Sequence, residues 1–280
     1  MQQIHSINSL REALDSIRHS GKTIGLVPTM GNLHAGHLSL IELAASHADV
    51  VVASIFVNPS QFVEGEDFAD YPRTLATDLE KLGDSNTSIV FIPDVESIYP
   101  ADMDTEVTVP SLDSIYCGEY RPGHFKGVAT VVTKLFNIVC PDVAVFGEKD
   151  YQQLLVIRRL VADLNIPVQV ISAPIVRESD GLAMSSRNQY LSDTERDKAT
   201  KLYECLSNMA EAIKLGRKDF ANMEAKAVKE LTAVGFKPDY VSIRDANTLN
   251  SAQTGSLVII AAAWLGKARL IDNVAVQSYD

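Results

Sequence analysis

The sequence has little cysteine, and its three cysteines are widely separated. Cys117, Cys140 and Cys205 form no Cys-x-x-Cys pair and no zinc-ligand spacing, and their number is odd. A chain that depends on disulfides or on a structural zinc would carry paired, closely spaced cysteines. The pattern indicates a reducing compartment, so we expect a cytoplasmic protein.

Positive charge and long apolar runs are also scarce. Lys and Arg number 25 against 36 Asp and Glu, giving a formal net charge of -11. Binding to nucleic acid or to a membrane surface needs a broad cationic face, so we expect neither partner. A phosphate ligand stays open, because a few local cations and a helix N-terminus can bind one. The N-terminal residues have no apolar signal core, and Leu257–Leu265 is too short to span a membrane.

What is present is an ordinary globular composition, with 46% hydrophobic and 22% charged residues in 280. This length favours one large and one small domain. Continuous apolar runs predict strands covered on both faces, and helix-like segments lie between them. The predicted strands are Thr23–Val27, Val50–Val57, Ser88–Ile92, Asp142–Phe146 and Val168–Ile171, and the predicted helices are His37–His47, Leu75–Leu82, Lys126–Val139 and Gln152–Leu164. This alternation predicts an α/β fold, a Rossmann-like doubly wound parallel sheet.

The pattern changes near residue 190. Ser192, followed three residues later by Glu195, predicts a capping box at the start of a helix over residues 193–213. A second helix at Phe220–Val234 and three strands follow, at Tyr240–Ile243, Leu257–Ala263 and Ala268–Ile271. We therefore expect a Rossmann-like catalytic domain over residues 1–188 and a smaller C-terminal α+β domain over residues 189–280.

Four chemically rich segments follow predicted strands. They are Pro28–His37, Asn58–Phe62, Gly147–Gln153 and Ile175–Asn188. Ligands of open α/β sheets bind at the carboxyl ends of the strands, and this rule places all four segments at one edge of the sheet. Their convergence predicts a site there.

The most specific of these segments is His34-x-Gly36-His37, where a strand gives way to a helix. A helix N-terminus attracts anions, and two imidazoles one turn apart add donors to the same phosphate. Gly36 leaves room for a base or ribose. The alternative is that His34 and His37 only cap the helix or lie at the surface, and the preceding strand and the glycine favour the phosphate site.

Met184-Ser185-Ser186-Arg187 follows the turn signal Asp180-Gly181. Two hydroxyls and a guanidinium suit a departing diphosphate, because Arg forms bidentate contacts. Taken alone, a Ser-Ser-Arg tripeptide is more often plain surface loop. Its significance comes from its combination with the histidine segment.

The remaining candidates are less specific. Lys149 and Asp150 fit either an exposed ion pair or contacts to phosphate and to ribose or metal. Gln61 and Gln153 suit hydroxyl and carboxylate groups of a small polar substrate, with surface amides as the alternative. Asp78 is a candidate metal contact, although a solvated helix residue is favoured. In addition, Arg121 and His124 are within reach of the site, Tyr71 and Arg73 are interpreted as structural, and Gln61–Pro72 is a candidate lid.

Taken together, these segments match a known family. The HxGH and Met-Ser-Ser-Arg segments resemble the HxGH and KMSKS-type signatures of nucleotidylyl transferases and class I aminoacyl-tRNA synthetases. The longer strings resemble the pantothenate synthetase (pantoate–β-alanine ligase) family. They are Pro28–His37, Ser54–Phe62, Tyr71–Thr74, Arg121–Val139, Phe146–Leu154, Arg177–Asn188 and Leu270–Asn273. The resemblance covers nearly the whole chain and is most specific over residues 24–190. Arg187 stands where many transferases have Lys, but the pantothenate synthetase pattern itself has Arg at this position.

The resemblance implies an ATP-dependent ligase of pantothenate biosynthesis, on the route to coenzyme A. It would condense (R)-pantoate with β-alanine to pantothenate, AMP and diphosphate through a pantoyl-adenylate, with Mg²⁺ and as a homodimer. The residues implied for ATP are Met30, Gly31, Asn32, Leu33, His34, Ala35, Gly36, His37, Gly147, Glu148, Lys149, Asp150, Val176, Met184, Ser185, Ser186 and Arg187. Those implied for pantoate and β-alanine are Pro28, Asn58, Gln61, Phe62, His124, Val131, Val132 and Gln153. The catalytic roles fall to His34, His37, Lys149, Ser185, Ser186 and Arg187.

Three other functions are compatible with parts of the sequence. A nucleotidylyl transferase would attach a nucleotide to a phosphorylated substrate and stop there. A truncated aminoacyl-tRNA synthetase is opposed by the acidic charge and by the lack of a basic RNA-binding domain. A nucleotide-binding module without activity would leave Gln61, Gln153 and the second domain without a purpose.

Overall fold

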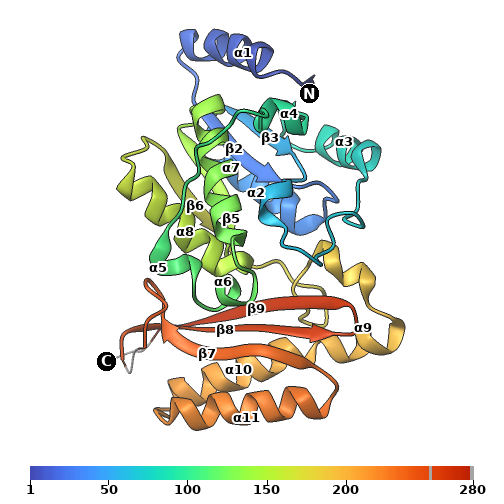
Figure 1. The fold of residues 1–280 in the computed structure, drawn as a ribbon, viewed down its shortest axis with the longest axis vertical. Coiled ribbons are helices and arrows are strands. Elements are labelled where there is room, and N and C mark those ends of the chain that lie inside the picture. The colour runs from blue at the N-terminus through green and yellow to red at the C-terminus, as the bar shows by residue number, and fades with distance from the viewer. Residues whose placement is uncertain (252–253, 278–280) are drawn as a thin grey trace. The chain divides into compact units, whose positions relative to one another are not determined.

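The computed structural model describes residues 1–251 and 254–277. The chain forms two compact units (Figure 1). Unit 1 comprises Met1–Glu148 and Gln152–Pro174, and unit 2 comprises Lys149–Tyr151 and Ile175–Asp280. The change of unit after Pro174 comes before the predicted boundary at residue 188, because Arg177 already binds Asp272 of the second unit. The short segment Lys149–Tyr151 belongs to unit 2 although its neighbours on both sides belong to unit 1.

Unit 1 contains a six-stranded parallel sheet with the strand order β1-β4-β3-β2-β5-β6. Its strands are β1 (Gln2–Ile4), β2 (Ile24–Thr29), β3 (Val50–Ile55), β4 (Ile89–Phe91), β5 (Val143–Gly147) and β6 (Gln169–Ala173). Every residue of β3 is buried, as expected for a strand covered on both faces. The predicted Rossmann-like sheet is therefore confirmed. Only β1, a three-residue edge strand, lies outside the predicted set.

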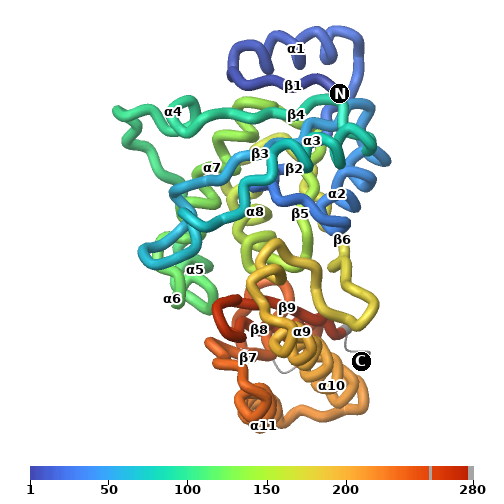
Figure 2. Tube along the Cα trace, turned by 90° about the vertical axis from the view of Figure 1, so that its right-hand side faces the viewer, coloured from blue at the N-terminus to red at the C-terminus, as the bar shows by residue number. Residues whose placement is uncertain are grey.

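Helices cover both faces of this sheet. The long ones are α1 (Ile7–His19), α2 (Ala35–Ala45), α3 (Leu75–Gly83), α7 (His124–Val139) and α8 (Tyr151–Asp163). Right-handed crossovers place α2 and α3 on one face and α1, α7 and α8 on the other, and Figure 2 shows α2 and α7 on opposite sides of the strands. Unit 1 also contains the short helical turns η1 (Pro59–Gln61), α4 (Val95–Ile98), α5 (Pro110–Asp113) and α6 (Cys117–Tyr120). The turn η2 (Glu148–Asp150) begins in unit 1 and ends in the unit 2 segment Lys149–Tyr151. One core, which includes Leu40, Ile41 and Val145, lies between α2 and the sheet.

Unit 2 is a small α+β unit, as predicted. It contains η3 (Ser186–Tyr190), α9 (Asp193–Ala199), α10 (Lys201–Lys214), α11 (Phe220–Ala233), β7 (Lys237–Asp245), β8 (Ser256–Leu265) and β9 (Ala268–Gln277). The three strands form an antiparallel sheet in the order β7-β8-β9, and α10 and α11 lie along one face of it (Figure 1). The capping box of Ser192 and Glu195 is present. The single helix expected over residues 193–213 is wrong in one respect, because α9 ends at Ala199 and α10 begins at Lys201, with Thr200 between them.

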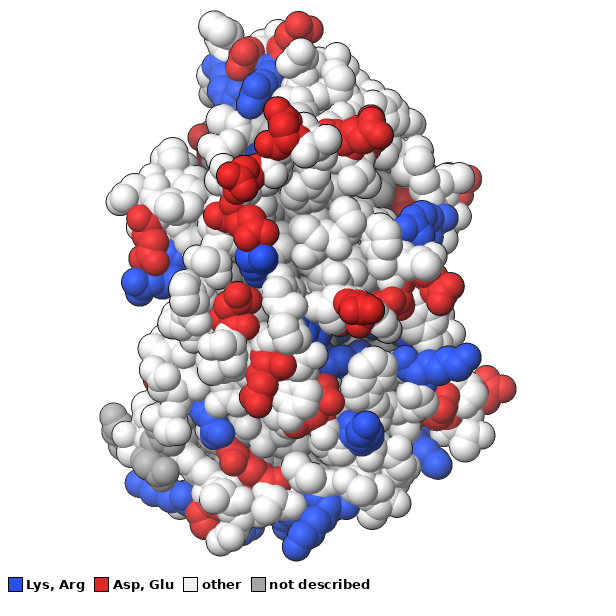
Figure 3. All heavy atoms as spheres, in the orientation of Figure 1, with Lys and Arg blue, Asp and Glu red and all other residues white. Residues whose placement is uncertain are grey.

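Two general features of the described residues bear on function. No helix within residues 1–251 and 254–277 is long and apolar enough to cross a membrane. Acidic and basic side chains are interspersed over the face drawn in Figure 3, and basic residues do not cover it. The face drawn in Figure 3 is therefore not the broad cationic face that nucleic acid requires.

Candidate active site

The segments that follow β2 and β3 begin side by side. The two strands are parallel neighbours, and Thr29 at the end of β2 pairs with Ile55 at the end of β3. Gly147 at the end of β5 lies at the same edge, since β5 pairs with β2 on its other side. The predicted convergence therefore holds for the segments of unit 1 that leave β2 and β3.

His34 and His37 form a reciprocal cap at the N-terminus of α2. The Nδ1 atom of His34 accepts a hydrogen bond from the Gly36 amide at 3.1 Å, and Nδ1 of His37 accepts one from the His34 amide at 3.3 Å. The ring centroids are 4.1 Å apart. The capping alternative is thus correct for one nitrogen of each ring.

These backbone contacts also define the tautomer that each neutral ring adopts. An amide N–H can only donate, so Nδ1 is the acceptor in each ring, and a neutral imidazole then carries its proton on Nε2. Both residues are half-buried rather than enclosed. Each histidine therefore presents an N–H donor from Nε2 beside the positive end of the α2 dipole. Capping and phosphate binding use different nitrogens and are compatible.

The turn between β2 and α2 is held by helix α3. Gly31 and Asn32 both have positive φ, at 82° and 50°. The Asp78 carboxylate accepts hydrogen bonds from the amides of Asn32 at 2.9 Å and Leu33 at 2.7 Å, and from the Thr74 hydroxyl at 3.1 Å. Lys81 donates to the Leu33 carbonyl. The view of Asp78 as a solvated residue is wrong, because it is 1% exposed. With three donors on its carboxylate, Asp78 serves the turn, which weakens its case as a metal contact.

Asp78→Asn should lower the free energy of unfolding by about 2–3 kcal/mol, since an amide NH₂ would then face two buried backbone donors. Urea unfolding measures this change. Asp84→Asn is the control, because Asp84 follows the same helix but is exposed, and it should change stability by less than about 0.5 kcal/mol. Equal stability of the Asp78 variant and the wild type would contradict the role of Asp78 in holding the turn.

The side-chain amide of Gln61 has a defined orientation. Asn58 Oδ1 accepts from the Ser60 amide at 3.3 Å, and Tyr99 donates its hydroxyl to the same oxygen at 2.8 Å. Asn58 Nδ2 therefore points to two acceptors, the Gly127 carbonyl at 3.3 Å and Gln61 Oε1 at 2.9 Å. With Oε1 engaged as an acceptor, Gln61 has its Nε2 donors for a further partner. An oxygen-rich ligand fits this arrangement.

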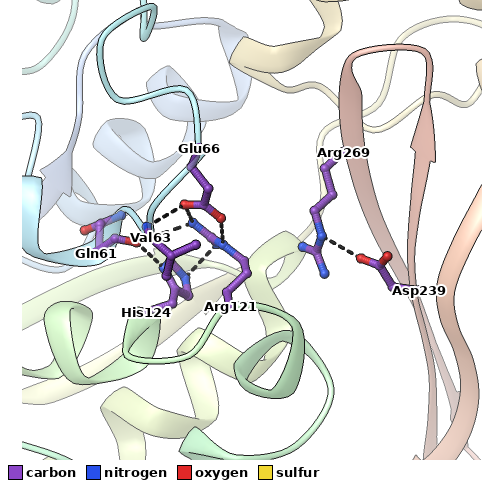
Figure 4. A network of polar contacts seen from close by, with 7 residues as sticks. All are labelled: Gln61, Val63, Glu66, Arg121, His124, Asp239 and Arg269. Atoms are coloured by element: carbon purple, nitrogen blue, oxygen red, sulfur yellow. Dashed lines mark hydrogen bonds and ion pairs between the residues drawn. The ribbon is translucent and has the colours of Figure 1, made fainter.

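The backbone of Gln61 is fixed by a second network (Figure 4). Its carbonyl accepts a hydrogen bond from His124 Nδ1 at 2.7 Å, and Arg121 donates to His124 Nε2 at 2.9 Å. Arg121 also forms an ion pair with Glu66, which accepts from the Val63 amide. Both His124 nitrogens thus have protein partners. One of these partners is the Gln61 carbonyl, so His124 helps to hold the backbone of Gln61.

The candidate lid over Gln61–Pro72 is anchored at its start and along its length. Phe62 packs against Phe68 and Tyr71, with ring centroids 5.2 and 5.6 Å away. Arg73 donates to the carbonyls of Phe68, Ala69 and Tyr71, which agrees with its structural interpretation. Among the other residues expected at the substrate, Val131 and Val132 are buried on α7, whereas Pro28 and Gln153 are half-buried.

Unit 2 contains the other predicted phosphate-binding segments. Val176 and Met184 are hydrogen-bonded, and the predicted turn at Asp180-Gly181 is present, with φ of 94° at Gly181. The Ser185 hydroxyl accepts from the Arg187 amide at 3.3 Å and caps η3. Lys149 Nζ lies 3.6 Å from Asp150. Met184, Ser185, Ser186, Arg187 and Lys149 are all half-buried.

The sequence did not reveal the supporting roles of several residues at these segments. Glu66, Tyr99 and Gly127 support Gln61, and Asp272 and Asn273 support the segments of unit 2. Gly127 lies inside a predicted helix, where glycine is unfavourable unless another part of the chain packs closely against it. This glycine could therefore have indicated the close contact with the Ser60–Gln61 backbone. The others are polar residues with partners far along the chain, and spacing does not reveal such partners.

A parallel α/β sheet whose strand ends lead into a His-x-Gly-His helix start defines a nucleotide-binding protein of the HxGH nucleotidylyl transferase class. Within this class, residues 2–275 match the family Pantoate-beta-alanine ligase. The chain belongs to the pantoate–β-alanine ligase family. The family predicted from the sequence is confirmed, and so is its assignment as a ligase.

Named relatives agree over nearly the full length. Pantothenate synthetase of Azotobacter vinelandii is 54% identical over 99% of both chains. The crystal structure of pantothenate synthetase from Thermus thermophilus superposes with a TM-score of 0.92 at 45% identity, covering 98% of this chain and 99% of that one. The pantoate-beta-alanine ligase of Francisella tularensis, solved with beta-gamma ATP and beta-alanine, gives a TM-score of 0.83 at 36% identity, covering 98% and 97%.

Proposed function

We propose that this chain condenses (R)-pantoate with β-alanine at the expense of ATP, giving pantothenate, AMP and diphosphate through a pantoyl-adenylate. The observation that carries the proposal is the pair of Nε2 donors of His34 and His37 at the start of α2. In the first step the pantoate carboxylate attacks the α-phosphorus of ATP and diphosphate leaves. In the second step the β-alanine amine attacks the acyl carbon and AMP leaves.

The ATP-binding residues are proposed in two groups. In unit 1, the turn Met30–His37 surrounds the nucleotide, and the two imidazoles donate to the phosphoryl oxygens as charge develops on them. In unit 2, the Lys149 ammonium, the Ser185 and Ser186 hydroxyls and the Arg187 guanidinium receive the departing diphosphate. Further contacts come from Gly147, Glu148, Asp150, Val176 and Met184.

Pantoate and β-alanine are proposed to bind near Gln61. Its oriented Nε2 donates to a pantoate oxygen, and Gln153 supplies a second amide. Pro28, Phe62, Val131 and Val132 are apolar and suit the geminal methyl groups of pantoate. Asn58 and His124 act through Gln61, since each hydrogen-bonds to it directly.

The reaction needs no nucleophile from the protein, and the described cysteines fit this. Burial raises the pKa of the Cys205 thiol to about 11, so it is not a thiolate at neutral pH. A Mg²⁺ ion would neutralise phosphate charge. Within residues 1–251 and 254–277 no three His, Cys, Asp or Glu side chains gather into a metal site, which suits an ion held mainly by the phosphates of ATP. We also propose a cytoplasmic homodimer.

An AMP-release assay, run with and without each substrate, tests the proposal. We expect AMP only when ATP, pantoate and β-alanine are all present, and exchange of labelled diphosphate into ATP with pantoate alone. Chelation of divalent cations by EDTA should abolish both, and added Mg²⁺ should restore them. A nucleotidylyl transferase would show exchange with a phosphorylated substrate instead, and exchange that ignores pantoate would contradict the proposed adenylation.

A further inference from the structure

Strand β9 contains two adjacent polar residues that are almost fully buried. Asp272 is 4% exposed and Asn273 is 5% exposed, in a strand whose neighbours include the buried Leu270 and Val276. Burial of a charge and an amide is costly unless both are well paired. Each of them is paired with a different segment that carries predicted phosphate-binding residues.

Asp272 fixes the hairpin that leads into Met184–Arg187. Its two carboxylate oxygens accept from the Arg177 guanidinium at 2.7 and 2.9 Å, a bidentate pair. Arg177 lies 3.6 Å above the ring of Tyr203, donates to the Gly181 carbonyl, and forms an antiparallel bridge with Ala183. A guanidinium held on several sides defines the position of the hairpin ahead of Ser185.

Asn273 fixes the other segment. Its Nδ2 donates to the Lys149 carbonyl at 3.1 Å, across 124 residues of sequence. Tyr151 adds a hydrogen bond from its hydroxyl to the Ala246 carbonyl at 2.8 Å. These contacts explain why Lys149–Tyr151 belongs to unit 2. The backbone N–H of Asn273 also donates to Asp272 Oδ1 at 2.7 Å, so the two anchors are coupled.

We propose that Asp272 and Asn273 are positioning residues for the phosphate chemistry, which together hold Lys149 and the Ser185–Arg187 segment at a fixed separation. This inference rests on the proposed function, because it assumes that both segments act on one ATP. Reacting groups must be held within fractions of an ångström, and a displacement of about 1 Å costs on the order of 10²-fold in rate. An anchor shared by both segments supplies that rigidity from within one unit.

The test compares Asp272→Asn and Asn273→Ala with a matched control, Glu224→Gln. Glu224 of α11 also forms an ion pair, with Arg244 at 2.7 Å, and it accepts from the Ile243 amide at 2.7 Å. In each anchor variant we expect pantoate-dependent diphosphate exchange to slow by at least about 10-fold in kcat, with the KM for pantoate changed by less than about 2-fold. Glu224→Gln should lower the Tm about as much as the anchor variants do, because it also weakens a half-buried ion pair. Its kcat should stay within about 2-fold of wild type.

Hydrogen exchange of the backbone amides provides a readout that does not need catalysis. In each anchor variant, hydrogen exchange should be at least about 10-fold faster under native conditions in at least one of the segments Met184–Arg187 and Lys149–Tyr151. Glu224→Gln should not change hydrogen exchange in either segment. The wild type could fail to use pantoate while the anchor variants still showed the expected faster hydrogen exchange. The proposed function would then be wrong, but the positioning role of Asp272 and Asn273 would be supported. Unchanged hydrogen exchange at both segments would contradict the positioning role of Asp272 and Asn273. A loss of kcat in Glu224→Gln equal to that in the anchor variants would also contradict it.

Discussion

Replacing His37 with alanine should lower kcat by about 10²-fold or more while changing the KM for ATP by a few-fold at most. The reason is that, in the proposed mechanism, the Nε2 donor of His37 binds charge that develops only as the phosphorus is attacked. Steady-state kinetics with ATP varied at saturating pantoate and β-alanine measure both constants. Near-normal turnover would remove His37 from the mechanism.

Alanine also deletes the cap that His37 forms with the His34 amide, which is worth about 1 kcal/mol of stability. Two variants separate the roles. Asparagine can place an oxygen near the Nδ1 position and retain the cap, whereas glutamine can place an NH₂ near the Nε2 position and retain the donor. We expect His37→Asn to unfold like the wild type but to be as slow as the alanine variant, and His37→Gln to recover part of kcat. The reverse order would show that capping, not donation, explains the loss.

Gly127→Ala should strongly damage both the stability and the activity of the enzyme. A Cβ at Gly127 would lie 2.1 Å from the Ser60 carbonyl oxygen and 2.7 Å from the Gln61 nitrogen, both backbone atoms. Either α7 or η1 must move, and overpacking of this kind costs about 1–3 kcal/mol or more. Because Asn58 and Gln61 lie on the displaced segment, we expect kcat/KM for pantoate to fall by about 10²-fold, measured together with urea unfolding.

Gly83→Ala is the matched control for that change. Gly83 is in the last turn of α3, and an added Cβ there meets nothing within 4 Å. Alanine should be neutral or stabilising by about 0.4–1 kcal/mol, since it reduces the entropy of the unfolded chain. An activity loss in Gly83→Ala as large as that in Gly127→Ala would show that the effect is not specific to contact with η1. A fully active Gly127→Ala enzyme would show that η1 can shift without cost to Gln61.

The sheet of unit 1 was predictable because its strands carry their own signal. Val50–Ile55 is apolar at every position except Ser54, as a strand between two helical layers must be, and five of the six strands were identified in this way. The exception, β1, is the three-residue segment Gln2–Ile4, too short and too polar for an apolar run. Helix α1 was also omitted, although its N-cap Ser6 and the buried Leu10 and Leu14, four residues apart, carry the usual helix signal.

Candidate site residues could be named from the sequence, whereas the residues that hold them in place could not. His34, His37 and Gln61 lie in the segments that leave β2 and β3, where a topological rule places ligand contacts, and the Ser185–Arg187 segment comes after β6. Asp78 was misjudged, because its partners Asn32 and Leu33 are more than 40 residues away and nothing local shows that it is buried. The hydrogen bonds of the His124 ring to the Gln61 carbonyl and to Arg121 could not be found from the sequence, because Gln61 lies 63 residues away.

By itself the sequence determined the fold class, the family, and which residues have the chemistry for phosphate and amide recognition, because apolar periodicity and short motifs are local properties of the chain. The tertiary structure decided which nitrogen of each histidine is the donor, which end of the Gln61 amide is presented, and which buried carboxylates hold the loops in place. These are properties of partners that lie far apart along the chain. Hydrogen-bond direction is set only when folding brings a specific donor to a specific acceptor.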